Sequence, residues 1–242
     1  MKMEPEQLWP GGPLFVQDDQ IRLTTDTVLL ADFARASAGG RGADLGCASG
    51  ALMLLLLWES PSIMMTGLEL SEHVAALAEE NMERNGFAEK ALIVPGDLRE
   101  TVKRFQSGSF DFVISNPPYF EPERCLQSPQ AERAAARAEL SCSLEDICAA
   151  AARLCRSGGR VFLCYRPEGL NRLMQTMTRH RLEPKRMRLV HHRPGREAML
   201  VLVEGRKDGN PGLRAEAPLM LYDEKGQETD EYRRIYRRDT PG

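Results

Sequence analysis

Short apolar runs alternate with segments of helical apolar spacing from about residue 42 to residue 204. Such alternation is typical of a parallel sheet whose helical crossovers cover both faces. At 242 residues the chain suits one domain with additions, and its core is large enough to need no disulfide or metal. We predict a doubly wound, Rossmann-like α/β fold with a seven-stranded sheet, mostly parallel with an antiparallel last strand.

The expected elements follow from apolar period and from glycine or proline breaks. A helix over 144–156 is expected to begin after Ser143 and to end at Gly158-Gly159. The Gly- and Pro-rich segment 207–218 predicts a loop, and the tail 219–238 a strand and a short helix. The other expected strands are 43–45, 63–69, 91–94, 110–115, 161–165, 186–192 and 198–203, and the other helices are 51–58, 74–82 and 168–180.

The strand expected over 110–115 runs directly into Asn116-Pro117-Pro118-Tyr119. A planar amine is a poor nucleophile, so a site that uses one must hold both its N–H groups. The Asn116 side-chain oxygen can accept one hydrogen, and the rigid prolines leave the Pro117 carbonyl free to accept the other. Tyr119 offers a ring on which a flat substrate can stack. The motif favours methyl transfer to an amine, and a proline-rich turn with Tyr119 as ordinary packing is the alternative.

Glycines and carboxylates mark a nucleotide site where the first two expected strands end. Asp44 and the turn formed by Gly46, Ala48 and Gly50 lie between the first strand and the first helix, where small residues let the backbone approach a ligand. Glu69, followed by Leu70, ends the second strand, where a carboxylate can hold ribose hydroxyls. This pattern fits NAD and S-adenosylmethionine alike.

The third and fourth expected strands favour S-adenosylmethionine as the cofactor. Asp97 and Leu98 follow the third strand and can read an adenine edge. Asn116 follows the fourth strand and stands where a transferred methyl would point. The alternative is that Asp44, Glu69 and Asp97 are merely carboxylates at the ends of loops.

Composition narrows the class of protein. The six cysteines form no Cys-x-x-Cys pair and have no histidine at metal-ligand spacing, so we expect reduced, mostly buried thiols and no metal. The first ten residues lack the apolar segment of a signal peptide, and the apolar run 51–58 is too short to cross a bilayer. We expect a cytoplasmic protein with no membrane contact, and the sequence indicates no oligomeric state.

Charge is unevenly distributed along the chain. Residues 1–150 hold 12 basic and 23 acidic side chains, whereas residues 151–242 hold 20 basic and 12 acidic ones, although the net charge is only −3. Basic residues concentrate in 179–196 and again in 233–238. These stretches could bind a polyanion, or they could form an ordinary solvated surface.

Over nearly its whole length the chain resembles the class I methyltransferases that act on N6 of an adenine in tRNA1(Val), the adenine just 3′ of the anticodon. The resemblance rests on the run from Phe15 to Ala31, on Ala136-Arg137-Ala138-Glu139 after the Asn-Pro-Pro-Tyr motif, and on the tail from Pro218 to Tyr236. Ala48 and Cys47 in the glycine turn depart from the family pattern.

This resemblance implies methylation of a tRNA adenine, with Asn116, Pro117 and Tyr119 as catalytic residues. It also implies three parts of one domain: an N-terminal β/helix extension over 1–40 that packs on the cofactor site, a cofactor-binding core over 41–205 and a basic tail over 206–242. The residues expected to contact tRNA are Phe120, Arg137, Arg233 and Arg234.

Other substrates remain open at this stage. Asn-Pro-Pro-Tyr also serves enzymes that methylate the exocyclic N2 of guanine in rRNA, N6 of adenine in DNA or a glutamine amide in proteins. The basic second half favours nucleic acid over protein. A catalytically silent RNA-binding protein with the same fold is a further alternative, which Ala48 leaves conceivable.

Overall fold

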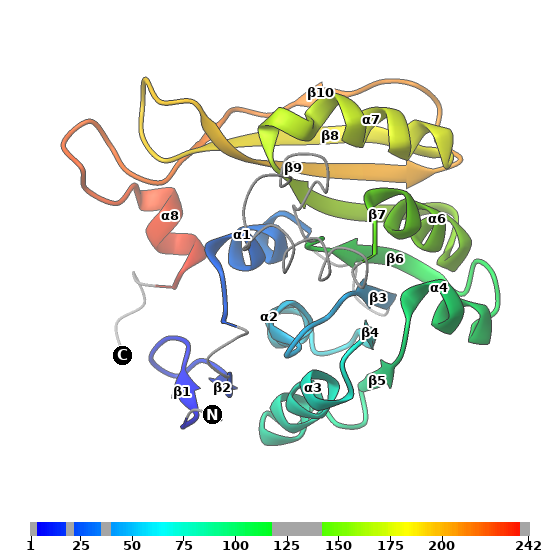
Figure 1. Cartoon of the computed structure of the whole chain (residues 1–242). Coiled ribbons are helices and arrows are strands. Elements are labelled where there is room, and N and C mark those ends of the chain that lie inside the picture. Colours follow the sequence, from blue (N-terminus) through cyan, green and yellow to red (C-terminus); the bar gives the residue numbers. More distant parts are fainter. Residues whose placement is uncertain (1–3, 18–21, 35–39, 118–141, 238–242) are drawn as a thin grey trace, which may run out of the picture.

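The computed structural model describes residues 4–17, 22–34, 40–117 and 142–237. Among these residues a nine-stranded sheet runs through the centre of the molecule in the order β10-β8-β9-β7-β6-β3-β4-β5, and β11 also pairs with β8 (Figure 1). The seven long strands are β3 (Arg41–Leu45), β4 (Met64–Glu69), β5 (Ala91–Pro95), β6 (Phe110–Ser115), β7 (Cys155–Tyr165), β8 (Leu182–His191) and β9 (Ala198–Lys207).

The pairing confirms the predicted fold. Strands β3 to β7 pair in parallel, while β9 is antiparallel to both of its neighbours, β7 and β8. Two short strands, β10 (Arg214–Ala215) and β11 (Leu219–Met220), extend the predicted seven along the outer edge of β8. The segment 207–218 is therefore not all loop, because Arg214 and Ala215 pair with Arg186 and Met187.

Helices cover both faces of the sheet and enclose two apolar clusters. Side chains alternate along the strands: Phe112 and Ile114 of β6 face one cluster, and Val113 faces the other. The first face carries α1 (Thr25–Ala34), α2 (Ala51–Glu59), α3 (Glu72–Arg84) and α8 (Asp230–Ile235). The second carries α4 (Leu98–Thr101), α6 (Leu144–Leu154) and α7 (Leu170–Arg179), with the short helices η1 (Val102–Arg104) and η3 (Pro167–Gly169).

The boundary predicted between the helix over 144–156 and the strand after it was wrong, and β8 and β9 are longer than the strands expected over 186–192 and 198–203. Helix α6 begins as expected, with a capping box between Ser143 and Asp146, but it ends at Leu154 and not at Gly158-Gly159. Strand β7 starts at once, and its pairing with β6 jumps from Phe110↔Cys155 to Phe112↔Arg160. Residues 156–159 therefore form a bulge in the strand, and Gly158 supports it with a left-handed φ of 73°.

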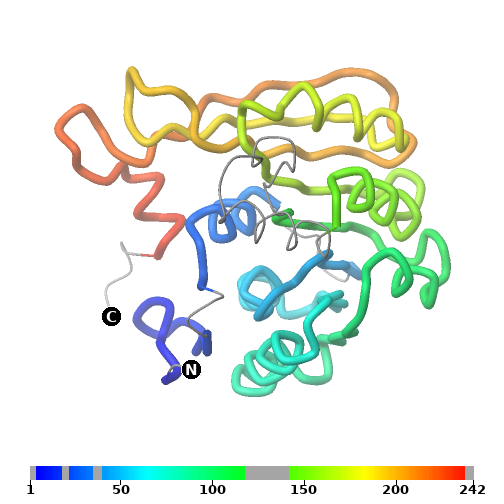
Figure 2. Tube along the Cα trace, viewed as in Figure 1, coloured from blue at the N-terminus to red at the C-terminus, as the bar shows by residue number. Residues whose placement is uncertain are grey.

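The N-terminal segment is fastened to the core through one buried side chain. Strands β1 (Glu6–Gln7) and β2 (Leu14–Phe15) form a hairpin that lies below α8 in the view of Figure 2, and Trp9 in its turn lines one cavity together with Ile235 of α8. Asn81 of α3, fully buried, accepts from the Val16 N–H (2.7 Å) and donates to the carbonyls of Val16 (2.8 Å) and Ser49 (2.9 Å). Asn81 therefore connects the N-terminal segment to the turn formed by Gly46, Ala48 and Gly50, because Ser49 lies within that turn.

Replacing Asn81 with alanine is expected to lower the free energy of unfolding by roughly 3 kcal/mol, since one N–H and two carbonyls would stay buried without partners. Asn85→Ala is the matched control. This less buried asparagine near the end of the same helix bonds the Leu14 N–H and carbonyl at 2.9 and 2.7 Å. Its loss should cost about 1 kcal/mol. Urea unfolding measures both, and equal losses would contradict a special role for Asn81.

Candidate functional site

The residues predicted to bind the cofactor lie at one edge of the sheet. Strands β6, β3, β4 and β5 are parallel neighbours, so their carboxyl ends meet there. Gly46 follows β3, Glu69 ends β4, Asp97 follows β5 and Asn116 follows β6. The topology therefore brings together four groups that are widely separated in the sequence, as the motif order predicts.

The turn between β3 and α2 has an unusual backbone that Glu69 holds in place. Gly46, Ala48 and Gly50 have positive φ values of 76°, 48° and 80°. One carboxylate oxygen of Glu69 accepts from the Ala48 N–H (3.0 Å), and the other accepts from the Ser71 N–H (2.9 Å). Each oxygen keeps further acceptor capacity for a ligand hydroxyl. Fastening the turn is a role for Glu69 that the sequence did not reveal.

Replacing Ala48 with glycine is expected to stabilise the fold slightly, by about 0.5–1 kcal/mol. Alanine is strained by a left-handed φ, and relief of that strain outweighs the greater freedom of glycine in the unfolded chain. The Ala48 N–H remains, so cofactor affinity should stay within about threefold of the native value. Thermal unfolding and calorimetric titration measure the two effects. A glycine variant with a lower melting temperature would contradict this account of the turn.

Asp44 is a carboxyl enclosed by the core of the protein. Its exposure is 1%, and neither of its oxygens has a hydrogen-bond partner among the described residues. Burial, and secondarily the charge of Glu69, raises the pKa of Asp44 to about 8. A buried carboxylate is stabilised by an ionic or hydrogen-bonding ligand. The position of Asp44 beside the glycine turn suits a cofactor that brings a positive charge.

Asp97 is already engaged by a neighbouring arginine. Its side chain caps α4 by accepting from the Arg99 N–H (2.9 Å), and it also accepts from the Arg99 guanidinium (Nε–Oδ1 2.9 Å). These hydrogen bonds from Arg99 lower the pKa of Asp97. Leu98 is buried, whereas Leu70 is 47% exposed. Of Leu70, Asp97 and Leu98, Leu70 presents the most open surface to a ligand. A ligand that binds the Asp97 carboxylate would have to share it with Arg99.

The side-chain amide of Asn116 is held from two sides. Its Nδ2 donates to Thr27 Oγ1 (3.2 Å) in α1, and its Oδ1 accepts from the Cys164 thiol (3.0 Å) in β7. Pro117 is buried next to it. Thr27 and Cys164 were missed in the sequence, where nothing marks either of them as a neighbour of Asn116.

Tyr119, Phe120 and Arg137 lie outside the described residues, so their predicted roles stay predictions. Arg233 and Arg234 are described, and both form ion pairs within α8: Arg233 with Asp230, and Arg234 with Glu231 (3.5 Å). Their side chains remain 40% and 53% exposed, so they also stay candidates for phosphate contacts.

Acidic partners compensate much of the basic stretch 179–196. Arg179 and His180 both contact Glu145, Arg186 pairs with Glu204 (2.8 Å), and Arg188 pairs with Glu231 (2.8 Å). The pairing favours the interpretation of this stretch as a structural surface more than as a continuous polyanion site. The predicted phosphate contacts remain Arg233 and Arg234 of α8, together with Arg137, which lies outside the described residues.

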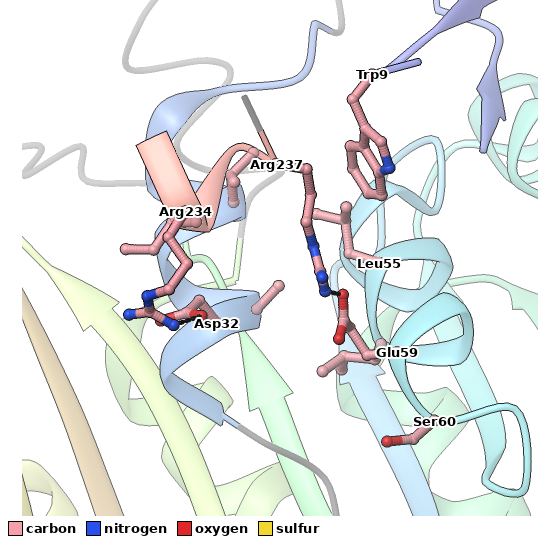
Figure 3. A pocket seen from close by; sticks show the side chains of 11 residues that line it. Trp9, Asp32, Leu55, Glu59, Ser60, Arg234 and Arg237 are labelled. Carbon is pink, nitrogen blue, oxygen red and sulfur yellow. Dashed lines mark ion pairs between the residues drawn. The ribbon is translucent and has the colours of Figure 1, made fainter. Parts of the chain in front are cut away.

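A cavity of about 410 Å³ lies among α1, α2, α8 and Trp9 (Figure 3). Two arginines enter it, and each faces a carboxylate: Arg234 lies 4.0 Å from Asp32, and Arg237 pairs with Glu59. The cavity is lined by the second half of α2, whereas the glycine turn lies before the first. The cavity is therefore separate from the sheet edge where the predicted cofactor-binding residues lie. Its two arginine–carboxylate contacts connect α8 and the residue Arg237 after it to α1 and α2.

Five of the six cysteines are described, and Cys125 lies outside the described residues. Cys47, Cys148, Cys155 and Cys164 are buried free thiols and Cys142 is partly buried, as expected. Within the described ranges, no three His, Cys, Asp or Glu side chains are grouped as metal ligands. In the same ranges, no helix combines the length and the apolar character that a bilayer crossing requires.

Comparisons with known proteins indicate the family of the chain. A family model described as methyltransferase small domain matches residues 20–180. The tRNA1(Val) (adenine(37)-N6)-methyltransferase of Porphyromonas gingivalis is 29% identical over 192 residues, which cover 77% of this chain and 74% of that protein. The protein of the same name from Escherichia fergusonii is 34% identical over 123 residues, and this alignment spans only half of each chain.

Solved structures show the same fold. An Agrobacterium tumefaciens protein described as a predicted O-methyltransferase superimposes with a TM-score of 0.73 at 22% identity, covering 88% of this chain and 96% of that one. Geranyl diphosphate methyltransferase in complex with S-adenosylmethionine gives a TM-score of 0.55 at 14% identity, covering 75% and 84%. At these identities the likeness establishes architecture alone.

Proposed function

The chain belongs to the methyltransferase small domain family, and on this premise we propose that it methylates N6 of an adenine in tRNA, with S-adenosylmethionine as the methyl donor. The relatives named for adenine 37 of tRNA1(Val) make that nucleotide the preferred target. The observation that carries the proposal is the placement of Asn116 at the same sheet edge as Asp44 and Glu69. We also propose a cytoplasmic location, because the proposed substrate is tRNA.

The sheet edge fits S-adenosylmethionine. The buried Asp44 carboxyl has unused acceptor capacity among the described residues, which suits a positive group of this cofactor. Glu69 has capacity left for ribose hydroxyls, and Gly46 has open space where a side chain would stand. Leu70 and Asp97 lie after the neighbouring strands, at the place expected for adenine. When bound, S-adenosylmethionine supplies an electrophilic methyl group on a sulfonium.

Asn116 and Pro117 would act on the substrate amine. The Asn116 Oδ1 and the Pro117 carbonyl are both acceptors, and each would take one N–H of the adenine amino group. No strong base is needed, because the nitrogen becomes acidic only as it gains positive charge. The contribution of the protein is orientation and electrostatic stabilisation. Tyr119 and Phe120 would stack on the unstacked adenine, and Arg137, Arg233 and Arg234 would contact tRNA phosphates.

Each of the three predicted parts of the chain has a role in this proposal. Residues 1–40 would pack on the cofactor site, which the Asn81 bonds to Val16 and Ser49 support. Residues 41–205 would bind the cofactor. The tail 206–242 would contribute α8 and its arginines to tRNA binding.

Incubation with methyl-labelled S-adenosylmethionine tests the proposal. Unmodified tRNA, rRNA, duplex DNA and cell protein are offered separately, and labelled nucleosides and amino acids are identified by chromatography. Label in N6-methyladenosine from tRNA is expected. Label in guanine, in DNA or in glutamine would reject tRNA adenine as the substrate, but the proposal that the protein methylates an amino group would stand. An absence of label, together with no cofactor binding by calorimetry, would overturn the enzyme assignment in favour of a silent RNA-binding protein.

A further inference from the structure

The N-terminal helix α1 reaches the catalytic motif through a hydroxyl. Thr27, in the first turn of α1, accepts a hydrogen from Asn116 Nδ2 at 3.2 Å, although the two residues are 89 positions apart. The contact joins the segment before the first core strand to the loop after the fourth strand of the core. The Asn116 side chain that makes this contact is only partly exposed.

Thr27 is itself fixed by the start of the helix. Thr24 precedes α1, and its hydroxyl lies 3.1 Å from the Thr27 hydroxyl and accepts from the Thr27 N–H at 3.4 Å. A hydroxyl has one hydrogen and two lone pairs. When Thr27 accepts from Asn116, its own hydrogen can go to Thr24. The result is a chain of hydrogen bonds from the helix start to the Asn116 amide.

Cys164 acts on the other end of the same amide. Its thiol is fully buried and donates to Asn116 Oδ1 at 3.0 Å. The contact assigns the oxygen of the amide to this side and the nitrogen to the side of Thr27. A thiol is a weak donor, so Oδ1 keeps most of its strength as an acceptor for a substrate N–H.

We propose that Thr27 and Cys164 are positioning residues that set the orientation of the Asn116 amide for methyl transfer. The proposal rests on the proposed function, since Asn116 must present its oxygen and not its nitrogen to the adenine amine. An amide turned by 180° would offer N–H groups to N–H groups, and the amine would be repelled. Thr27 disfavours this rotation when its own hydrogen goes to Thr24, because it can then only accept from Nδ2, and Cys164 disfavours it by donating to Oδ1.

Steady-state kinetics on Thr27→Val and Thr27→Ser test the role of Thr27. Valine keeps the shape of threonine without the hydroxyl, and serine keeps the hydroxyl. Valine should lower kcat about tenfold or more, which corresponds to about 1.4 kcal/mol of transition-state stabilisation, while KM for S-adenosylmethionine changes less than about twofold. Serine should restore kcat to within about threefold of the native value. Thr178→Val, the same change at an exposed position of α7, is the control and should behave as native.

Cys164→Ala and Cys164→Ser give an independent test. Serine retains a donor and should keep kcat close to native, whereas alanine should lower kcat several-fold without changing KM for the cofactor. Melting temperatures show whether each variant is folded. A Thr27→Val enzyme with native kcat, or a serine variant as impaired as the valine one, would overturn the inference. Failure of the native protein to methylate any amine would instead reject the proposed function.

Discussion

Asn116→Ala is expected to lower kcat for tRNA methylation by about 10²–10³-fold, the range typical for loss of one preorganised polar group at a reacting centre. The substrate amine loses an acceptor at the moment when its nitrogen becomes positive and its N–H groups become acidic. The cost falls on the transition state much more than on the bound ground state, so kcat should fall while KM for tRNA stays within about threefold.

Cofactor affinity separates this effect from general damage. Glu69 holds the glycine turn through the N–H groups of Ala48 and Ser71, and these bonds do not pass through Asn116. The Kd for S-adenosylmethionine should therefore change less than about threefold. Single-turnover assays and calorimetry on the same sample measure both quantities.

The matched control for this substitution is Asn171→Ala. Asn171 is an exposed asparagine on α7, and its side chain accepts from the Gln175 amide at 3.2 Å. This variant should keep native kcat and native cofactor affinity. If Asn116→Ala also retains native kcat, Asn116 does not hold the reacting amine.

The sequence was sufficient for the parts of the site that are local in the chain. Glycines between an apolar run and a helix predict the turn after β3, and the strand before Asn116 was correctly bounded at 110–115 because its apolar run is continuous. Parallel topology then places the ends of β3, β4, β5 and β6 together without any further information. These predictions depend on period and order, which a single sequence records.

Contacts between distant segments could not be predicted in this way. Nothing in the sequence pairs Asn81 with Val16 or Thr27 with Asn116, because each pair is joined only after the N-terminal segment folds back on the core. The same limit applies to the basic stretch, where the carboxylates that neutralise Arg186 and Arg188 come from β9 and α8. The boundary error at α6 has a local cause: a glycine pair supports a bulge in β7 as readily as it ends a helix.

Asp44→Asn is expected to have two opposite effects: weaker cofactor binding and a more stable protein at neutral pH. The pKa of Asp44 is raised to about 8 by burial, whereas the carboxyl titrates near 3.8 when unperturbed. Between these values the folded state binds a proton that the unfolded state has lost. Stability therefore falls as pH rises through this window, by about 1.4 kcal/mol per pH unit, and levels off above about 8.

Asparagine removes this titration. Asp44→Asn and the native protein should have similar stability near pH 4–5, and the variant should be several kcal/mol more stable near pH 8. Urea unfolding across this range measures the difference. Asp111→Asn is the matched control with the opposite sign, because hydrogen bonds from the Arg41 N–H and the Arg156 guanidinium lower the pKa of Asp111. That variant should lose stability at neutral pH and approach the native protein in acid.

The cofactor effect follows from the same carboxyl. Binding of a positive group needs the ionised form of Asp44, so the native protein should release a proton on binding S-adenosylmethionine, and affinity should rise by up to tenfold per pH unit until about pH 8. Asparagine cannot ionise, so affinity should fall about 10- to 100-fold and lose this pH dependence. Calorimetry in buffers of different ionisation enthalpy measures the released proton. A native protein that binds the cofactor without releasing a proton at pH 7 would show that Asp44 is not the group that receives its positive charge.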